Sequence, residues 1–394
     1  MAVPKLRFKA DDGSDYPDLV EIKIGDAIKE AKRPLDMKDD EKYQLVTVKR
    51  RNEGIISRGM FYGRNILVKN YYTVKKGDYI ISKRQVIHGA NGIVPPELDD
   101  AIVSNEYMVL SDSSTLLVNY LALYSMTKKM YHMFYISSYG VDIEKMFFNV
   151  DDWKKKKIMV PCIKEQQKIV ELFSLIDTVI EKQKETVSAW EERKKGVMQK
   201  LFGQEVRFKA DDGSEFPEWE EKKLGDIADV IMGQSPDGDS VNLNDGLYLI
   251  QGKADLLGSN IVPERLTNKP TKICEPLDLV MTVRAPVGYV VRIEFKACIG
   301  RGVCAIRAKK IDSNYLLHYM TFKESEWKKI EQGSTFTAVN SDDVKTFKVS
   351  VPCLKEQQKI ADCLSSLDEV IEKQKATLTA WEELKKGLLQ QMFV

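Results

Sequence analysis

The side chains with the clearest chemical capacity in this sequence are the arginines and lysines of two segments. Residues 42–84 hold eleven Lys or Arg against two acids, and residues 248–310 hold eleven against five. Arg and Lys bind phosphates and donate to guanine, whereas Asn and Gln suit adenine. The net charge is only +1, which argues against a uniformly basic nucleic-acid binder. We therefore predict two basic patches on a near-neutral body.

Motifs of several enzyme classes are missing from the sequence. It has no GxxxxGK(S/T) phosphate loop, no NPPY or DPPY tetrapeptide and no glycine-rich cofactor loop. Pro17-Asp18 followed by Glu21-Ile22-Lys23 imitates a nuclease signature, but only two residues separate its parts, and Glu218 replaces Asp18 in a second copy. The six cysteines lack a CxxC pair or a nearby His, so we predict buried free thiols and no metal site.

The segments that must position these side chains occur twice along the chain, as an internal repeat. Residues 7–26 and 207–226 match at 13 of 20 positions, and residues 160–202 and 351–393 match at 27 of 43. The interiors of the two large segments, roughly 27–150 and 227–341, share only a skeleton of apolar positions. The pattern predicts two equivalent scaffolds that hold two different surfaces.

A heptad pattern follows each of two Val-Pro pairs and predicts two helices of about 38 residues, roughly 55 to 60 Å long. The first seam consists of Ile169, Phe173, Ile176, Ile180, Gln183, Val187, Trp190, Lys194, Val197 and Leu201. The second consists of Ile360, Leu364, Leu367, Ile371, Gln374, Leu378, Trp381, Lys385, Leu388 and Met392. Neither helix can bury its stripe alone, so we expect an antiparallel pair.

The apolar seam residues, with Trp190 and Trp381 as packing anchors, should form the interface of this helix pair. Gln183 and Gln374 stand at equivalent seam positions, where they either form a polar pair that fixes the register or lie at solvated edges.

The segments between the helices predict α+β domains. Short β-like runs occur at residues 43–48, 79–82, 102–110, 247–251, 279–283 and 298–308, and helical patterns at 116–133 and 314–330. We predict a first globular domain over 1–158, a first long helix over 159–203, a second domain over 204–349 and a second long helix over 350–394. No apolar run reaches the ~20 residues of a membrane span, and no signal peptide is apparent, so we expect a cytoplasmic protein.

Several segments together resemble the specificity subunit family of type I restriction-modification systems. They are the doubled proline, cysteine and EQQKI unit (161–169, 352–360), GDYIISKRQ (77–85), TVRAPVG (282–288), IGRG (299–302) and QGSTF (332–336). The resemblance implies a non-catalytic subunit whose two target recognition domains each read half of a split site in double-stranded DNA.

It also implies that the helices set the spacing and dock two methyltransferase subunits, with motor-nuclease subunits joining the full complex. S-adenosylmethionine, ATP and magnesium are then expected only on those partner subunits.

We predict DNA contacts from Arg, Lys, amide and hydroxyl side chains in the two domains. The first set is Lys49, Arg50, Arg51, Arg58, Lys83, Arg84, Gln85, His88 and Asn91. The second set is Gln234, Ser235, Gln251, Lys253, Arg284, Arg301, Ser334 and Thr335. Arg84 and Arg284 occupy the same repeat position, which favours a shared phosphate contact because a base reader should differ between domains.

Two other functions stay open at this stage. A coiled-coil scaffold could join proteins instead of DNA, with the basic patches facing acidic partners. A fused nuclease or methyltransferase subunit is disfavoured by the missing motifs.

Overall fold

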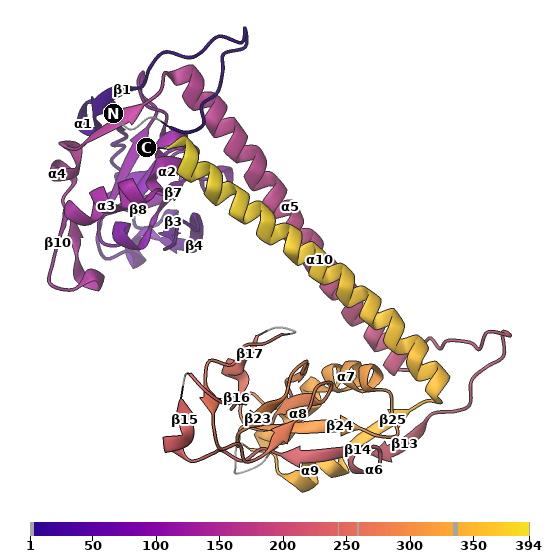
Figure 1. The fold of residues 1–394 in the computed structure, drawn as a ribbon. Coiled ribbons are helices and arrows are strands. Elements are labelled where there is room, and N and C mark those ends of the chain that lie inside the picture. The colour runs from indigo at the N-terminus through magenta and orange to yellow at the C-terminus, as the bar shows by residue number, and fades with distance from the viewer. Residues whose placement is uncertain (1–3, 243, 258–259, 334–337, 394) are drawn as a thin grey trace. The chain divides into compact units, whose positions relative to one another are not determined.

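The computed structural model describes residues 4–242, 244–257, 260–333 and 338–393 (Figure 1). The chain forms two units, Met1–Gln183 with Thr377–Val394, and Lys184–Ala376. Each unit contains one globular segment and a part of each long helix, α5 (Ile163–Phe202) and α10 (Leu354–Met392). Because the division falls inside both helices, the domain bounds predicted from the sequence stay predictions.

Unit 1 contains three sheets, of orders β2-β9-β6-β7, β4-β3-β8-β5 and β1-β12, and a short β10-β11 pair. Its strands are β1 (Val20–Lys23), β2 (Lys29–Glu30), β3 (Lys42–Val48), β4 (Ile55–Tyr62), β5 (Tyr71–Thr73), β6 (Tyr79–Ser82), β7 (Asn91–Ile93), β8 (Ile102–Ser104), β9 (Tyr107–Ser111), β10 (Ser138–Tyr139), β11 (Phe147–Phe148) and β12 (Lys157–Val160). Its shorter helices are α1 (Ile24–Ala27), η1 (Gly63–Asn65), η2 (Val86–His88), η3 (Pro96–Leu98), α2 (Val118–Ser125), α3 (Lys128–Ile136), η4 (Ile143–Lys145) and α4 (Val150–Lys154).

Unit 2 contains sheets of orders β14-β24-β21-β22, β15-β19-β16-β23-β20 and β13-β25, and a β17-β18 pair. Its strands are β13 (Glu220–Lys223), β14 (Ala228–Met232), β15 (Val241–Asn242), β16 (Leu247–Ile250), β17 (Leu256–Leu257), β18 (Asn260–Ile261), β19 (Leu266–Thr267), β20 (Ile273–Cys274), β21 (Leu279–Thr282), β22 (Val290–Arg292), β23 (Ala297–Ile299), β24 (Val303–Ala308) and β25 (Lys348–Val351). Its shorter helices are α6 (Leu224–Ile227), η5 (Gly238–Ser240), η6 (Lys253–Asp255), α7 (Ser313–Phe322), α8 (Glu324–Gly333) and α9 (Ser341–Thr346).

The same strand pairing is built in both units. β6 lies between β9 and β7 in unit 1, and β21 lies between β24 and β22 in unit 2, with antiparallel pairing throughout. One parallel pair recurs in the other sheet, as β3 with β8 and as β16 with β23. The predicted α+β class is therefore confirmed, and so is the shared scaffold.

Four of the predicted segments are each two elements. The run 102–110 is β8 and β9, divided by a turn at Asn105-Glu106, and the run 298–308 is β23 and β24, divided at residues 300–302. The helical pattern 116–133 divides between α2 and α3, where Thr127 accepts a hydrogen bond from Met130 N as an N-cap. The pattern 314–330 divides between α7 and α8.

Each globular core is closed by the end of one long helix. In unit 1, Phe393 at the end of α10 packs against the rings of Tyr120 and Tyr124, at centroid distances of 5.1 and 5.6 Å. In unit 2, Phe202 at the end of α5 packs against Tyr315 and Tyr319, at 5.7 and 5.4 Å. Folding of each globular segment is thereby coupled to a helix that follows the other copy of the repeat.

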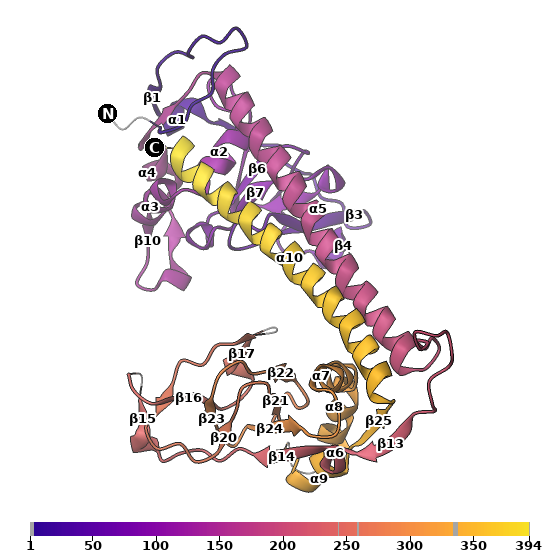
Figure 2. The same cartoon turned by 45° about the vertical axis from the view of Figure 1, so that its right-hand side comes forward.

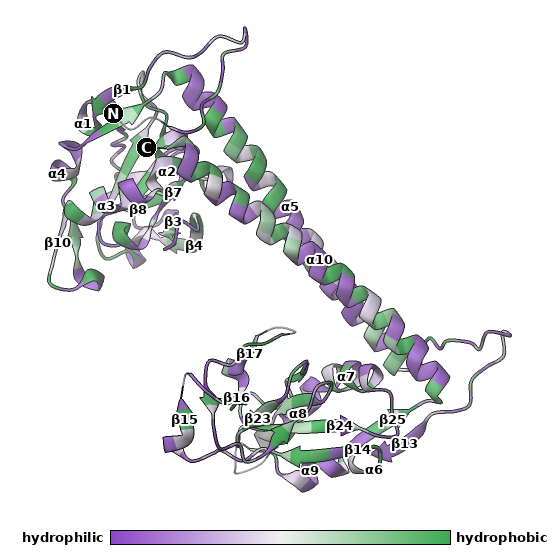
Figure 3. Ribbon diagram, viewed as in Figure 1, coloured by the Kyte–Doolittle hydropathy of each residue, from purple (hydrophilic) through white to green (hydrophobic). Residues whose placement is uncertain are grey.

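The long helices run antiparallel within each unit. In unit 2, Lys194 Nζ of α5 lies 2.5 Å from Asp368 Oδ1 of α10, and in unit 1, Lys385 Nζ of α10 lies 2.5 Å from Asp177 Oδ1 of α5. All twenty seam positions are buried or half-buried, including Trp190 and Trp381, and Figure 3 shows apolar and polar residues along both helices. None of the predicted seam positions is therefore fully exposed, and the residue-by-residue interface stays a prediction. Gln183 and Gln374 belong to different units, so their pairing stays a prediction.

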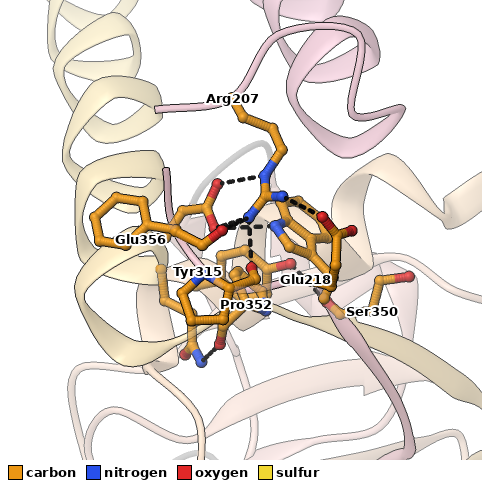
Figure 4. A network of polar contacts seen from close by, with 10 residues as sticks. Arg207, Glu218, Tyr315, Ser350, Pro352 and Glu356 are labelled. Atoms are coloured by element: carbon orange, nitrogen blue, oxygen red, sulfur yellow. Dashed lines mark hydrogen bonds and ion pairs between the residues drawn. The ribbon is translucent and has the colours of Figure 1, made fainter. Parts of the chain in front are cut away.

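A buried carboxylate fastens the loop before each globular segment to the start of a long helix. Arg207 Nε and Nη2 donate to Glu356 at 3.1 and 2.9 Å, and Trp219 Nε1 donates at 3.0 Å (Figure 4). Arg7 makes the same bidentate contact with Glu165, at 3.1 and 2.6 Å. Because both glutamates are buried, these pairs explain why Arg and the first residue of EQQKI recur together.

The next residue of EQQKI joins each helix to its globular segment. Gln166 Oε1 accepts from Leu117 N at 2.9 Å, ahead of α2, and its Nε2 donates to Pro161 O. Gln357 Oε1 accepts from Asp312 N at 2.8 Å, ahead of α7, and Nε2 donates to Pro352 O. Figure 2 shows α7 beside the start of α10. The recurrence of EQQKI is therefore structural.

One backbone contact is also duplicated. In unit 2, Val206 N donates to Lys200 O at 3.2 Å, where the chain leaves α5. In unit 1, Leu6 N donates to Gln391 O of α10 at 3.1 Å. Both long helices thus end against the segment that leads into a globular region.

Candidate nucleic-acid interface

In unit 1, two loops bring predicted basic side chains together. The turn between β3 and β4 carries Arg50 and Arg51, and Arg51 N donates to His88 O at 2.6 Å. Arg51 and Asn52 have φ values of 59° and 56°, and Asn52 N is held by Gly89 O at 2.9 Å. A strained hairpin turn is therefore fixed against η2.

Between these loops lies a cavity of about 460 Å³, lined by Arg50, Arg51, His88, Ser125, Tyr131 and Glu144 among others. A buried polar atom here lacks a partner, because His88 Nε2 makes no hydrogen bond within the described residues. The cavity can therefore offer donors to an anion or to a base edge.

Carboxylates accompany the basic side chains of unit 1. Arg50 Nη2 lies 2.8 Å from Glu144 Oε2, and His88 Nε2 lies 3.4 Å from Glu144 Oε1. Arg84 Nε lies 2.7 Å from Glu106, which raises the pKa of the guanidinium, and the Arg84 guanidinium also lies 4.9 Å from the centre of the Phe147 ring.

The remaining predicted residues of unit 1 differ in their exposure and in their partners. Arg58 is exposed on β4, while Lys49 lies 3.8 Å from Glu53 and Lys83 Nζ donates to Asn105 O. Gln85 is half-buried, with Oε1 unpartnered among the described residues.

Asn91 is a correction to the predicted set. It is only 3% exposed, and Asn91 Oδ1 accepts from Tyr79 OH at 2.9 Å while Nδ2 donates to Asn52. Because both ends of the amide are used inside the domain, Asn91 supports the strained turn instead of facing a ligand.

Unit 2 gathers four predicted residues around one turn. Gln234 N donates to Ile299 O at 2.9 Å, and Arg301 N donates to Ser235 Oγ at 3.3 Å. Gln251 packs against the same turn, where a Cβ on Gly302 would lie 2.0 Å from Gln251 O. The close approach requires glycine, so Gln234, Ser235, Gln251 and Arg301 are held together at the start of β24.

The other predictions for unit 2 have separate outcomes. Lys253 Nζ lies 3.3 Å from the centre of the Tyr289 ring and donates to Leu256 O, so it has partners inside the domain. Arg284 is exposed two residues after β21, as Arg84 is after β6. Ser334 and Thr335 lie outside the described residues.

A second cavity of about 640 Å³ in unit 2 contains His318, Lys194, Asp368 and Arg292 in its lining. His318 is buried, and its Nε2 lies 3.1 Å from Ser365 Oγ. Burial, with the nearby Lys194, lowers the pKa of His318 to about 4. The imidazole is therefore neutral near pH 7.

Sequence reasoning missed Glu106 and Glu144, which face the predicted basic residues from distant parts of the chain. These carboxylates are recognisable only by their closeness to an arginine in the folded chain, which the spacing of residues along the sequence does not reveal. The six cysteines are free, and Cys274, Cys298 and Cys304 are buried while the other three are half-buried.

Neither a candidate metal site nor a candidate membrane span occurs within the described ranges. No group of three or more His, Cys, Asp or Glu residues that could hold a metal ion occurs among the described residues. None of the helices in the same ranges has the length and apolar character needed to cross a bilayer.

Comparison with protein families finds one match that recurs in both copies. A model described as "Type I restriction modification DNA specificity domain" matches residues 16–188 and 217–380. The putative type I restriction enzyme MjaX specificity subunit of Methanocaldococcus jannaschii is 33% identical over 259 residues. That match spans 63% of this chain and 60% of the relative. The MjaVIII specificity subunit of the same organism is 24% identical over 97% of this chain and 94% of its own.

Solved structures share the fold. A chain from work on complex assembly and conformational transition of the type I R-M system has a TM-score of 0.62 at 23% identity, covering 96% of this chain and 98% of its own. The type I restriction-modification S subunit from M. genitalium has a TM-score of 0.61 at 14% identity, covering 100% and 99%.

Proposed function

The chain belongs to the type I restriction modification DNA specificity family, which makes DNA sequence specificity its function, and we propose that each unit reads one part of a two-part site in double-stranded DNA. The observation that carries this proposal is that the two units share one scaffold but present different polar side chains on it. The protein-scaffold alternative is not favoured by the family.

The residues that the two units share suit positioning of the unit on the DNA backbone. The residues that differ between the units suit the reading of bases. Arg84 and Arg284 follow equivalent strands, so we assign them to phosphates, which carry no sequence information. Arg50, Arg51 and His88 in unit 1 have no counterpart in type among Gln234, Ser235 and Gln251 in unit 2. Guanine is favoured by arginine and adenine by glutamine, so the two units should select different bases.

We assign no catalysis to this chain and place the chemistry on partner subunits. Two methyltransferase subunits would dock on the helix pair, since the repeated helices offer equivalent surfaces in both units, and motor-nuclease subunits would complete the complex. S-adenosylmethionine, ATP and magnesium then belong to those partners. A methyltransferase must take its target adenine out of the duplex, which needs the recognised site to be held beside it.

Methylation mapping in cells that express the chain with its methyltransferase subunits tests the proposal. We expect an asymmetric two-part motif with a fixed gap of unspecified bases. Exchanging residues 227–341 for those of a relative should alter one part only, and a continuous palindrome would contradict the proposal. The purified chain alone, incubated with DNA and S-adenosylmethionine, should transfer no methyl groups.

A further inference from the structure

Glu144 lies on an arm that leaves the body of unit 1 after α3. The arm is formed by β10 and β11, which pair through Ser138 with Phe148 and Tyr139 with Phe147 (Figure 1). Glu144 sits in η4 between these strands, where Glu144 N donates to Asp142 Oδ1 at 3.2 Å. A capped turn therefore fixes the backbone that carries this carboxylate.

The Glu144 carboxylate faces the cavity between the two loops of unit 1 and is held there by Arg50. It accepts from Arg50 Nη2 at 2.8 Å on one oxygen, and His88 Nε2 lies 3.4 Å from the other. Arg50 and Glu144 remain 50% and 52% exposed. Because a carboxylate has about four acceptor positions and a guanidinium five donors, both groups keep free capacity toward solvent.

The presence of the Glu144 carboxylate on a candidate nucleic-acid interface needs a physical explanation. On a surface that meets DNA, an exposed negative charge is repelled by phosphates. That penalty is offset where the carboxylate accepts a hydrogen bond from cytosine N4, the pairing that Asp and Glu make in the major groove. Arginine makes the corresponding contact with guanine O6 and N7.

Resting on the function proposed above, we propose that Arg50 and Glu144 together read one C·G base pair in the part of the site that unit 1 recognises. Glu144 accepts from the cytosine amino group, Arg50 donates to the guanine, and their mutual hydrogen bond holds the two groups side by side. The pair offers an acceptor and donors at adjacent positions, which is the complement of a C·G edge.

The test is methylation mapping with the full complex carrying E144Q. The amide removes the charge without changing size. With its single oxygen accepting from Arg50, the amide nitrogen takes the place of the second carboxylate oxygen and presents donors to the cytosine amino group. We expect one C·G position in the part read by unit 1 to relax or change, with discrimination falling roughly ten- to hundred-fold. The gap and the part read by unit 2 should stay unchanged. Exchange of residues 227–341 identifies which part belongs to which unit.

E106Q is the matched control. Glu106 also pairs with a single arginine, and it is 44% exposed against 52% for Glu144. Since we assign its partner Arg84 to a phosphate, E106Q should alter affinity for all sequences alike and leave the motif as it is. Circular dichroism of both variants checks that the fold is retained.

Three results would overturn the inference. They are an unchanged motif with E144Q, a change that falls on an A·T position, and a change in the part read by unit 2. Each of them leaves the proposed function standing. A wild-type chain that yields no two-part motif overturns the proposed function, and the inference with it.

Discussion

In unit 1, three basic side chains of the candidate interface lie against carboxylates, namely Lys49 with Glu53, Arg50 with Glu144 and Arg84 with Glu106. In unit 2, Arg284 and Arg301 form no ion pair with any residue in the described ranges, and Arg301 N donates instead to the Ser235 hydroxyl. The sheets and helix anchors beneath the two surfaces are nevertheless alike. The difference teaches that this fold separates support from recognition, because loops at equivalent strand ends can change charge without disturbing the strands.

The largest expected effect concerns the two buried anchors, the ion pairs of Arg7 with Glu165 and of Arg207 with Glu356. Removing one partner of a buried ion pair leaves an uncompensated charge, so R7M and R207M should each lower the free energy of unfolding by about 3 to 5 kcal/mol. R7M should lower it more, because Trp219 still donates to Glu356 while Leu19, at the equivalent position, has no donor.

Hydrogen exchange of the first turns of α5 and α10 measures the two anchor effects separately. The conservative variants R7K and R207K serve as controls, since they keep the charge but lose the bidentate geometry. Equal protection in R7M and R207M would contradict the role given to Trp219.

The second prediction uses a buried group that only unit 2 has. His318 has a pKa of about 4 in the folded chain against an ordinary 6.5, so the unfolded chain takes up its proton first. Stability from this group is complete above pH 6.5 and falls as the pH drops toward 4, by about 3 kcal/mol in total. Leu123 stands at the equivalent position of α2, so H318L should remove this contribution.

Urea denaturation of the wild type and H318L at pH 7, 5.5 and 4 provides the measurement for His318. Carboxylates elsewhere titrate in both proteins, so the difference between their slopes against pH isolates the histidine. Parallel slopes would mean that His318 does not carry this effect.

The third prediction contrasts the two arginines assigned to phosphates. R284A should weaken binding to every duplex sequence and reduce the slope of log affinity against log salt by about one. E106Q frees Arg84 from its carboxylate, so it should strengthen binding uniformly and steepen the same slope. Titrations of duplex DNA with the methyltransferase complex at several salt concentrations measure both, and a sequence-dependent change would argue against phosphate contacts.

The smallest expected effect concerns the two ion pairs of the long helices. Lys194 and Lys385 are 16% and 20% exposed, but their aspartates are 43% and 47% exposed, so K194M and K385M should each lose only up to about 1 kcal/mol. Chemical denaturation at low and high salt checks this. K194M should also bring the pKa of His318 closer to its ordinary value, an effect for which K385M has no counterpart.

The elements that the sequence predicts well are those with regular spacing. The heptad seams place every predicted position inward because each helix must bury a continuous stripe. Runs such as 102–110 and 298–308 look continuous because both halves are apolar. The turns at Asn105-Glu106 and 300–302 mark places where the chain passes from one sheet to another, which only the fold reveals.

The candidate site follows from tertiary contacts that residue types do not encode. The sequence predicted both Arg51 and His88 as DNA-contacting residues. That they lie side by side depends on a backbone hydrogen bond between two loops that are distant in the sequence. Asn91 has the type of a base reader and is used internally instead, because the turn above it needs a partner. Glu144 lies 94 residues from Arg50 along the chain, so only folding brings the two together.

The paired contacts Val206 N to Lys200 O and Leu6 N to Gln391 O bear on how the repeat is connected. In unit 2 the five residues 201–205 link donor and acceptor, whereas in unit 1 the covalent route between them passes through the rest of the chain. The same contact between a helix end and the following segment forms with and without a short peptide link between them. Packing therefore does not dictate which copy of the repeat comes first in the sequence. A circularly permuted gene, opened near residue 204 and with Phe393 joined to Leu6 by a short linker, should encode the same two units.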